Sequence, residues 1–152
     1  MGAAYFYHLT RNPLEHTLPI LLGKALGAGW RVTVRGASLE GIARLDDSLW
    51  KHPEEGFLPH GLDTSETAAD QPVLLTCGMK NLNNSACLMT VHGADITADE
   101  VNALERVCVL FDGADGAAVQ HARVQWKALT DAGCSAQYWS EESGVWEKKA
   151  ER

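Results

Sequence analysis

Short apolar runs typical of β-strands alternate with helix-like segments along this chain, and this alternation constrains its fold more than any other feature. The runs are rich in aromatic and β-branched residues, and they predict strands at residues 3–9, 30–35, 72–76, 86–92, 107–111 and 135–139. Capping residues, prolines and glycines predict helices at residues 14–28, 38–50 and 114–132. This order predicts a Rossmann-like α/β fold of three layers, with a mostly parallel central sheet and helices on both faces.

The length of the chain fits a single domain. Its 152 residues are 45% hydrophobic, which is enough to bury a core without disulfides or a structural metal. We expect residues 1–140 to form this domain and residues 141–152 to form a charged C-terminal tail that holds Trp146. Residues 51–70 are rich in proline, glycine and polar side chains, so they predict a long irregular connection of the kind that often carries function.

The charge of the chain disfavours direct nucleic-acid binding. The formal net charge is −7 and the isoelectric point is about 5.3, so no basic surplus remains to track phosphates. No apolar stretch has the length of a membrane span. The N-terminus also lacks the basic region and hydrophobic run of a signal peptide. We therefore expect a cytoplasmic protein that binds neither DNA directly nor a membrane.

Familiar motifs for catalysis, metal binding and cofactor binding are missing from the sequence. The cysteines form no Cys-x-x-Cys pair, the histidines lack metal-ligand spacing, and no serine lies in a Gly-x-Ser-x-Gly motif. Residues 23–29 resemble a phosphate loop but end a predicted helix instead of beginning one. We expect no catalytic residue, metal or cofactor. The alternative is a small nucleotide-dependent or hydrolytic α/β enzyme that uses loops at strand ends, with Asp112, Asp115 and His92 as candidates.

One contiguous stretch carries the most specific pattern in the sequence. From Arg44 to His60 the chain reads Arg-Leu-Asp-Asp-Ser-Leu-Trp, then a six-residue spacer, then Phe-Leu-Pro-His. This pattern resembles the chi subunit of the bacterial DNA polymerase III clamp loader. The first strand, which contains Tyr-Phe-Tyr, and the order of the later elements also agree with that family, so the resemblance spans nearly the whole chain.

The resemblance implies a non-catalytic adaptor. Chi proteins bind the psi subunit, which joins them to the clamp loader, and they bind the acidic tail of single-stranded DNA-binding protein, which ends in Pro-Phe. The resemblance assigns Trp50 and Phe57 to psi contact, and a chi-like adaptor of a repair helicase would use the same two residues. From the residues alone, Trp50 and Phe57 fit equally well as side chains that close the local core over a helix end.

The last predicted helix carries the second surface that the resemblance implies. Its core stripe is predicted at Ala118, Ala122, Leu129 and Ala132, so another face presents Val119, Arg123, Trp126, Lys127 and Thr130. The resemblance assigns tail binding to this face, because Arg123 and Trp126 match the family's arginine and aromatic positions, whereas Val119 stands where the family often has a lysine. An apolar bed beside cations suits a phenylalanine and a terminal carboxylate. In the alternative interpretation, Trp126 packs against Trp139 or Trp146 and Arg123 is solvated.

Overall fold

A single eight-stranded sheet organises the part of the chain that the computed structural model describes, which is residues 2–51, 60–64 and 66–152. Its strands are β1 (Ala3–Leu9), β2 (Val32–Arg35), β3 (His60–Leu62), β4 (Val73–Thr76), β5 (Cys87–Thr90), β6 (Arg106–Asp112), β7 (Ser135–Ser140) and β8 (Glu147–Glu151). The helices are α1 (Leu14–Gly27), α2 (Leu39–Lys51), α3 (Ala98–Ala103) and α4 (Gly116–Asp131), with a short 3₁₀ helix, η1 (Ala68–Asp70).

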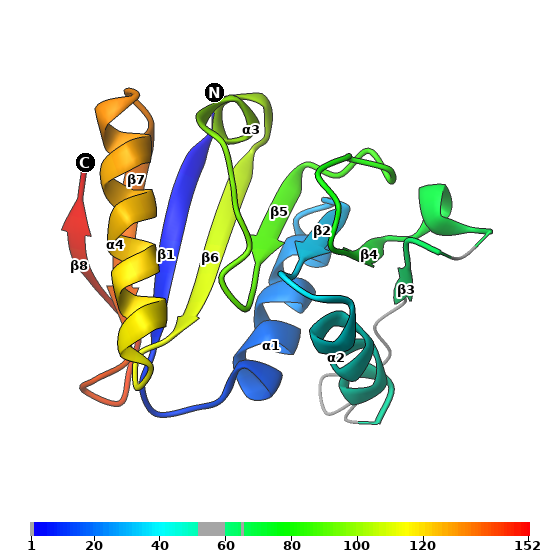
Figure 1. The fold of residues 1–152 in the computed structure, drawn as a ribbon, viewed down its shortest axis with the longest axis horizontal. Coiled ribbons are helices and arrows are strands. Elements are labelled where there is room, and N and C mark those ends of the chain that lie inside the picture. Colours follow the sequence, from blue (N-terminus) through cyan, green and yellow to red (C-terminus); the bar gives the residue numbers. More distant parts are fainter. Residues whose placement is uncertain (1, 52–59, 65) are drawn as a thin grey trace.

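The spatial order of the strands is β3-β4-β2-β5-β6-β1-β7-β8, with β3 and β8 at the two edges (Figure 1). Every pairing from β3 to β7 is parallel, and β8 pairs antiparallel with β7. The inner strands β2, β4 and β5 are buried along their whole length, as expected where helices cover both faces of a parallel sheet.

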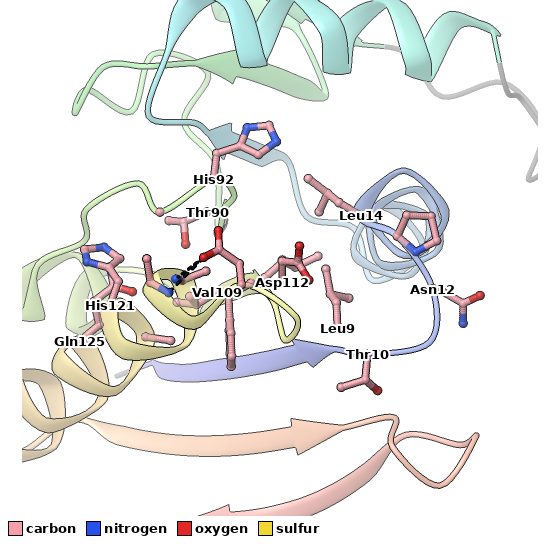
Figure 2. Close-up of a pocket in the computed structure, with 18 of the residues that line it drawn as sticks. Leu9, Thr10, Asn12, Leu14, Thr90, His92, Val109, Asp112, His121 and Gln125 are labelled. Atoms are coloured by element: carbon pink, nitrogen blue, oxygen red, sulfur yellow. Dashed lines mark hydrogen bonds between the residues drawn. The ribbon is translucent and has the colours of Figure 1, made fainter.

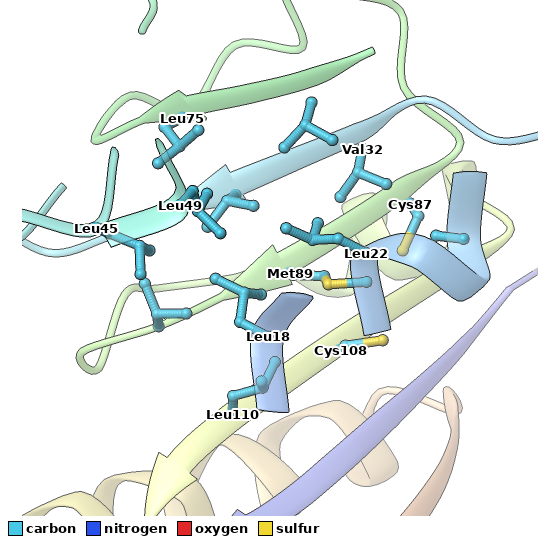
Figure 3. Close-up of a cluster of buried hydrophobic side chains, with 14 of the residues drawn as sticks. Leu18, Leu22, Val32, Leu45, Leu49, Leu75, Cys87, Met89, Cys108 and Leu110 are labelled. Atoms are coloured by element: carbon cyan, nitrogen blue, oxygen red, sulfur yellow. The ribbon is translucent and has the colours of Figure 1, made fainter. Parts of the chain in front are cut away.

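Successive residues of the strands point into two separate cores. On β6, Cys108 and Leu110 join the core that contains residues of α1 and α2, while Val107, Val109 and Phe111 join the core under α3 and α4. Figure 3 shows the first of these cores, where Leu18 and Leu22 of α1 lie close to the sheet. The prediction of a three-layer, mostly parallel α/β fold is therefore confirmed.

Several local signals in the sequence act as predicted. The Ser38 hydroxyl oxygen accepts a hydrogen bond from the backbone N–H of Gly41 at the start of α2, at 3.1 Å. Gly29 follows the end of α1 with a φ of 84°, so residues 23–29 are a helix end, as the sequence predicted. The four cysteines are free, and Cys87, Cys108 and Cys134 are buried. Within the described ranges, no helix has the length and apolar character needed to cross a membrane.

The C-terminal segment differs most from its prediction. Residues 141–152 were expected to form a charged tail, but Glu147–Glu151 form β8 on the edge of the sheet. Backbone hydrogen bonds between Arg152 and Ala136 extend this pairing by one residue. The short elements α3 and β3 were also not predicted from the sequence.

Candidate functional site

A cavity of about 370 Å³ lies between α4 and β8, and we name it the α4–β8 cavity. Its floor is aromatic and comes from three strands: Phe6 on β1, Phe111 on β6 and Tyr138 on β7. The wall from α4 consists of Val119, Ala122, Arg123 and Trp126. The wall from the C-terminal edge consists of Ala150, Glu151 and Arg152. Residues from both ends of the chain thus form one site.

Trp126 is half-buried and packs on this floor. Its ring meets the rings of Phe6 and Tyr138 edge to face, with centroid distances of 5.4 and 6.3 Å. The alternative in which Trp126 packs against Trp139 or Trp146 is therefore wrong. Trp146 instead meets Tyr7 on the other core, and the Trp139 indole N–H donates to the side chain of Gln137 at 3.1 Å.

Arg123 is an exposed cation at the rim of the aromatic floor. It makes no hydrogen bond or ion pair with any other described residue. Burial and the nearby charge of Glu142 raise the pKa of Tyr138, and the positive charge of Arg123 opposes that shift. The hydroxyl of Tyr138 is hydrogen-bonded to Nδ1 of His8. The cavity therefore combines an apolar, aromatic bed with an available guanidinium.

An exposed aromatic side chain, that of Trp50, lies at the end of α2. Leu45 and Leu49 of this helix are buried in the core, whereas Trp50 is 50% exposed. The Trp50 ring lies against the buried ring of His60, with a centroid distance of 4.2 Å. Nε2 of His60 lies 3.3 Å from both the carbonyl oxygen and a carboxylate oxygen of Asp46, which holds β3 against α2. Phe57, the other residue assigned to psi contact, lies outside the described residues.

A larger cavity, of about 790 Å³, lies at the carboxyl ends of β1, β5 and β6, and we name it the β1–β6 cavity. Figure 2 shows His92, Asp112 and Leu14 around it. The chain leaves β1 through α1 on one face of the sheet and leaves β6 through α4 on the other. Open α/β sheets usually bind ligands at such a point. Asp112, Asp115 and His92, the candidates of the enzyme alternative, all line this cavity.

Two carboxylates of the β1–β6 cavity are engaged within the protein, whereas the buried Nε2 of His121 has no hydrogen-bond partner among the described residues. Asp115 caps α4 and accepts from the backbone N–H groups of Ala117 and Ala118 at 3.0 and 3.4 Å. Asp112 accepts from the N–H of Ala114 at 2.9 Å. Burial lowers the pKa of His92, which favours its neutral form. Across the described chain, no group of three His, Cys, Asp or Glu side chains is placed to hold a metal ion.

Comparison with known proteins identifies the family. Residues 1–137 match the family model described as "DNA polymerase III chi subunit, HolC". The chain belongs to the DNA polymerase III chi subunit family. A relative in Rickettsia prowazekii (strain Madrid E), named "Probable DNA polymerase III subunit chi", is 21% identical over 111 residues, which cover 70% of this chain and 67% of the relative.

In this chi-family chain, the structure brings together only part of the predicted tail-binding face. Val119, Arg123 and Trp126 line the α4–β8 cavity, but Lys127 and Thr130 do not. Nζ of Lys127 lies 2.8 Å from a carboxylate oxygen of Asp131, and the Thr130 hydroxyl donates to the carbonyl oxygen of Trp126 at 2.8 Å.

The predicted core stripe of α4 is also only partly correct. Ala122 and Leu129 are buried, but Ala132 is exposed, and Gln125 is the third buried residue of the helix. The Gln125 side-chain amide donates to the carbonyl oxygen of Ala94 at 3.0 Å. This bond satisfies a polar group that an apolar pattern cannot reveal.

Sequence reasoning missed the residues that complete the α4–β8 cavity. Phe6, Phe111 and Tyr138 were assigned to strands but not to a common site, and Ala150 and Arg152 were assigned to the tail. The position of Phe6 in the first strand predicts only that its side chain points to one face of the sheet, together with the residues two positions away. No sequence pattern shows which helix covers that layer.

Proposed function

We propose that this chain is a non-catalytic adaptor of the DNA polymerase III clamp loader. In this proposal, it binds the acidic Pro-Phe tail of single-stranded DNA-binding protein in the α4–β8 cavity and the psi subunit at the surface around Trp50. Membership of the chi family supports a role in the polymerase III holoenzyme. The tail proposal rests on one observation: the aromatic floor lies beside the guanidinium of Arg123, which has no partner among the described residues.

The chemistry of the tail matches this cavity. A terminal phenylalanine ring can bury apolar surface against Phe6, Phe111 and Trp126, and aromatic rings favour edge-to-face contacts of the kind already present there. The terminal carboxylate can accept two parallel hydrogen bonds from a guanidinium. The ring contributes affinity through burial, while the carboxylate selects the end of a chain over an internal segment.

Three synthetic peptides test tail binding. The first is acidic and ends in Pro-Phe with a free carboxylate, the second ends in Pro-Ala, and the third is the first with an amidated end. We expect only the first to bind tightly and to raise the melting temperature of the chain. Because the chain has five tryptophans, the part of the intrinsic fluorescence change that Trp126→Phe removes is the readout of binding beside Trp126. Equal binding of all three peptides would contradict the proposal, because neither the ring nor the carboxylate would then be recognised.

The psi proposal is tested by Trp50→Ala. Because the Trp50 side chain is half exposed, this change should reduce co-purification with psi and leave melting of the isolated chain nearly intact. Leu39→Ala is a matched control, since Leu39 is 73% exposed at the other end of α2. Identification of the proteins pulled down from lysate distinguishes psi from a repair helicase. If Trp50→Ala unfolds the chain at growth temperature, Trp50 is a core residue and the assignment is withdrawn.

A further inference from the structure

The α4–β8 cavity has a second arginine on the wall opposite Arg123. Arg152 lines the cavity from the end of β8. Its backbone is fixed to β7, because its N–H donates to the carbonyl oxygen of Ala136 at 2.8 Å and its own carbonyl oxygen accepts from Ala136 at 3.0 Å. Ala136 is fully buried. The base of the Arg152 side chain is therefore attached to a rigid part of the sheet.

The pairing of β8 with β7 brings Arg152 to the cavity. Ala150 pairs with Tyr138, and Ala150 lines the cavity together with Glu151 and Arg152. The carboxylate of the intervening Glu151 is engaged elsewhere, since it accepts hydrogen bonds from Gln137 at 3.0 Å and Lys148 at 3.3 Å. The acidic neighbour of Arg152 is thus occupied by other partners.

The two cavity arginines differ from the nearest lysine in what they bind. Neither Arg123 nor Arg152 has a side-chain hydrogen bond or ion pair within the described chain. Lys127, by contrast, is paired with Asp131 and lies outside the cavity. Two unpaired guanidiniums around one aromatic floor exceed what a single carboxylate requires, because one guanidinium already matches a carboxylate with two parallel hydrogen bonds.

We propose that Arg152 binds an acidic side chain upstream of the ligand's terminal residue, while Arg123 binds the terminal carboxylate. This inference rests on the proposed function and assigns a specificity-determining residue within the same site. The cavity then selects ligands by two anionic groups held on either side of one aromatic ring. Arg152 takes the role of second cation that the sequence had assigned to Lys127.

The inference is tested by measuring how two peptides bind to the original chain and to four variants. The acidic peptide carries three aspartates ahead of its Pro-Phe end, and the neutral peptide has asparagines in their place; both keep a free carboxylate. The variants are Arg152→Gln, Arg123→Gln, Lys127→Gln and Lys149→Gln, each of which removes one positive charge. Lys149 is the matched control on β8, because its side chain lies beside Glu147 and does not line the cavity.

We expect Arg152→Gln to weaken binding of the acidic peptide by about tenfold, in line with the loss of one charge-assisted hydrogen-bonded pair. Its affinity for the neutral peptide should change by less than about twofold, since that peptide lacks the partner of Arg152. Arg123→Gln should weaken both peptides. The two lysine variants should leave both affinities near those of the original chain. Arg152→Lys should recover part of the loss, because it restores the charge without the fork.

The outcomes separate this inference from the function on which it rests. If the original chain binds neither peptide, the proposed function fails. If the original chain binds the acidic peptide and Arg152→Gln binds it equally well, only the role of Arg152 fails. Equal weakening of both peptides by Arg152→Gln would also overturn the inference, because selectivity for the aspartates would be missing.

Discussion

The two cavities on either side of α4 differ in how their polar groups are satisfied. They share Phe111 and Ala122 as part of their walls. The β1–β6 cavity is the larger and lies where α/β sheets usually bind ligands, yet the carboxylates of Asp112 and Asp115 accept hydrogen bonds from the protein's own backbone. The α4–β8 cavity is smaller, but its two arginines have no partner among the described residues. For this reason the proposed tail-binding site is the smaller cavity, where exposed positive charge lies beside apolar surface.

The start of α4 illustrates the difference most clearly. A helix N-terminus attracts anions because its first N–H groups lack partners. In this chain, the carboxylate of Asp115 already accepts from two of those groups. A phosphate approaching the β1–β6 cavity would meet that negative charge. Many α/β folds use these free N–H groups to bind nucleotides, but here Asp115 already accepts from two of them.

The largest effect is expected from Arg123→Glu. This change removes the partner of the terminal carboxylate and places a negative charge beside it, so binding of the acidic tail peptide should weaken by at least about 100-fold, or about 2.7 kcal/mol. Arg123→Lys should retain part of the affinity, since it keeps the charge but loses the bidentate geometry. Fluorescence titrations at low and physiological salt measure both effects, and psi binding is the control that should not change. If Arg123→Glu binds the tail with the same affinity as the original chain, the α4–β8 cavity is not the tail-binding site.

A smaller effect, on stability instead of binding, is expected at Glu141, whose partners Thr10 and Asn12 line the β1–β6 cavity. The buried carboxylate of Glu141 accepts from the side chain of Asn12 at 3.0 Å and from the backbone N–H of Thr10 at 3.1 Å. Glu141→Ala leaves these donors without their partner and should lower the free energy of unfolding by about 2 kcal/mol. Urea denaturation measures this change. Tail-peptide affinity should stay the same, and a large loss of affinity would mean that the two cavities are coupled.

The contribution of Glu141 should also depend on pH. Burial by itself would raise the pKa of this carboxyl, but the hydrogen bonds from Asn12 and Thr10 outweigh burial and lower it. The stabilisation is therefore present above the pKa of the unfolded chain, about 4.3 for a glutamate, and is lost as the pH falls through the lower pKa of the folded chain. The stability difference between the original chain and Glu141→Ala should shrink at acidic pH, and a constant difference would contradict this assignment.

Filling each cavity with one side chain gives an intermediate test of binding. Ala150→Leu adds bulk inside the α4–β8 cavity without changing charge, and it should weaken tail binding by about tenfold, or about 1.4 kcal/mol. Ala117→Leu adds the same bulk at the β1–β6 cavity and should leave binding unchanged. Ala150 and Ala117 are both exposed, so neither substitution should unfold the chain. The comparison fails if the two variants behave alike.

The smallest effect is expected from nucleotides and divalent cations. Because Asp112 and Asp115 in the β1–β6 cavity already accept hydrogen bonds from the backbone, ATP, adenosine and Mg²⁺ should shift the melting temperature by less than about 1 °C at millimolar concentration. The acidic Pro-Phe peptide should produce a clear shift under the same conditions. A saturable shift with adenosine that Asp112→Ala abolishes would instead support the enzyme alternative.

The fold followed from the sequence because period-two apolar runs and helix caps are local signals. The cap at Ser38 is a signal of this kind, and the short, continuously apolar runs that became the buried strands β2, β4 and β5 are equally local. β8 could not be predicted in this way, since its residues Glu-Lys-Lys-Ala-Glu are all exposed and its pairing with β7 uses the backbone. Charged residues on an edge strand also protect it from pairing with other chains, so such strands read as polar tails.

The candidate site was predicted only along α4 itself. Val119, Arg123 and Trp126 follow one another at helical spacing, which places them on one face. Lys127 also follows Arg123 by four residues, so helical spacing did not exclude it, but its ammonium pairs with Asp131 and it does not line the cavity. Arg152 was missed because its position depends on β8. The alternative packing of Trp126 against Trp139 or Trp146 failed because Tyr138, the neighbour of Trp139 on β7, lies under α4, whereas Trp146 packs on the other core.

A single titration tests most directly whether the α4–β8 cavity is the binding site. The acidic Pro-Phe peptide is added to the ¹⁵N-labelled chain, and chemical shifts are followed for the indole N–H of Trp126 and the backbone amides of Arg123 and Arg152, with those of His92 and Gly93 at the β1–β6 cavity as the comparison. We expect saturable shifts in the first set and none in the second. Shifts confined to His92 and Gly93, or none in either set, would contradict this expectation.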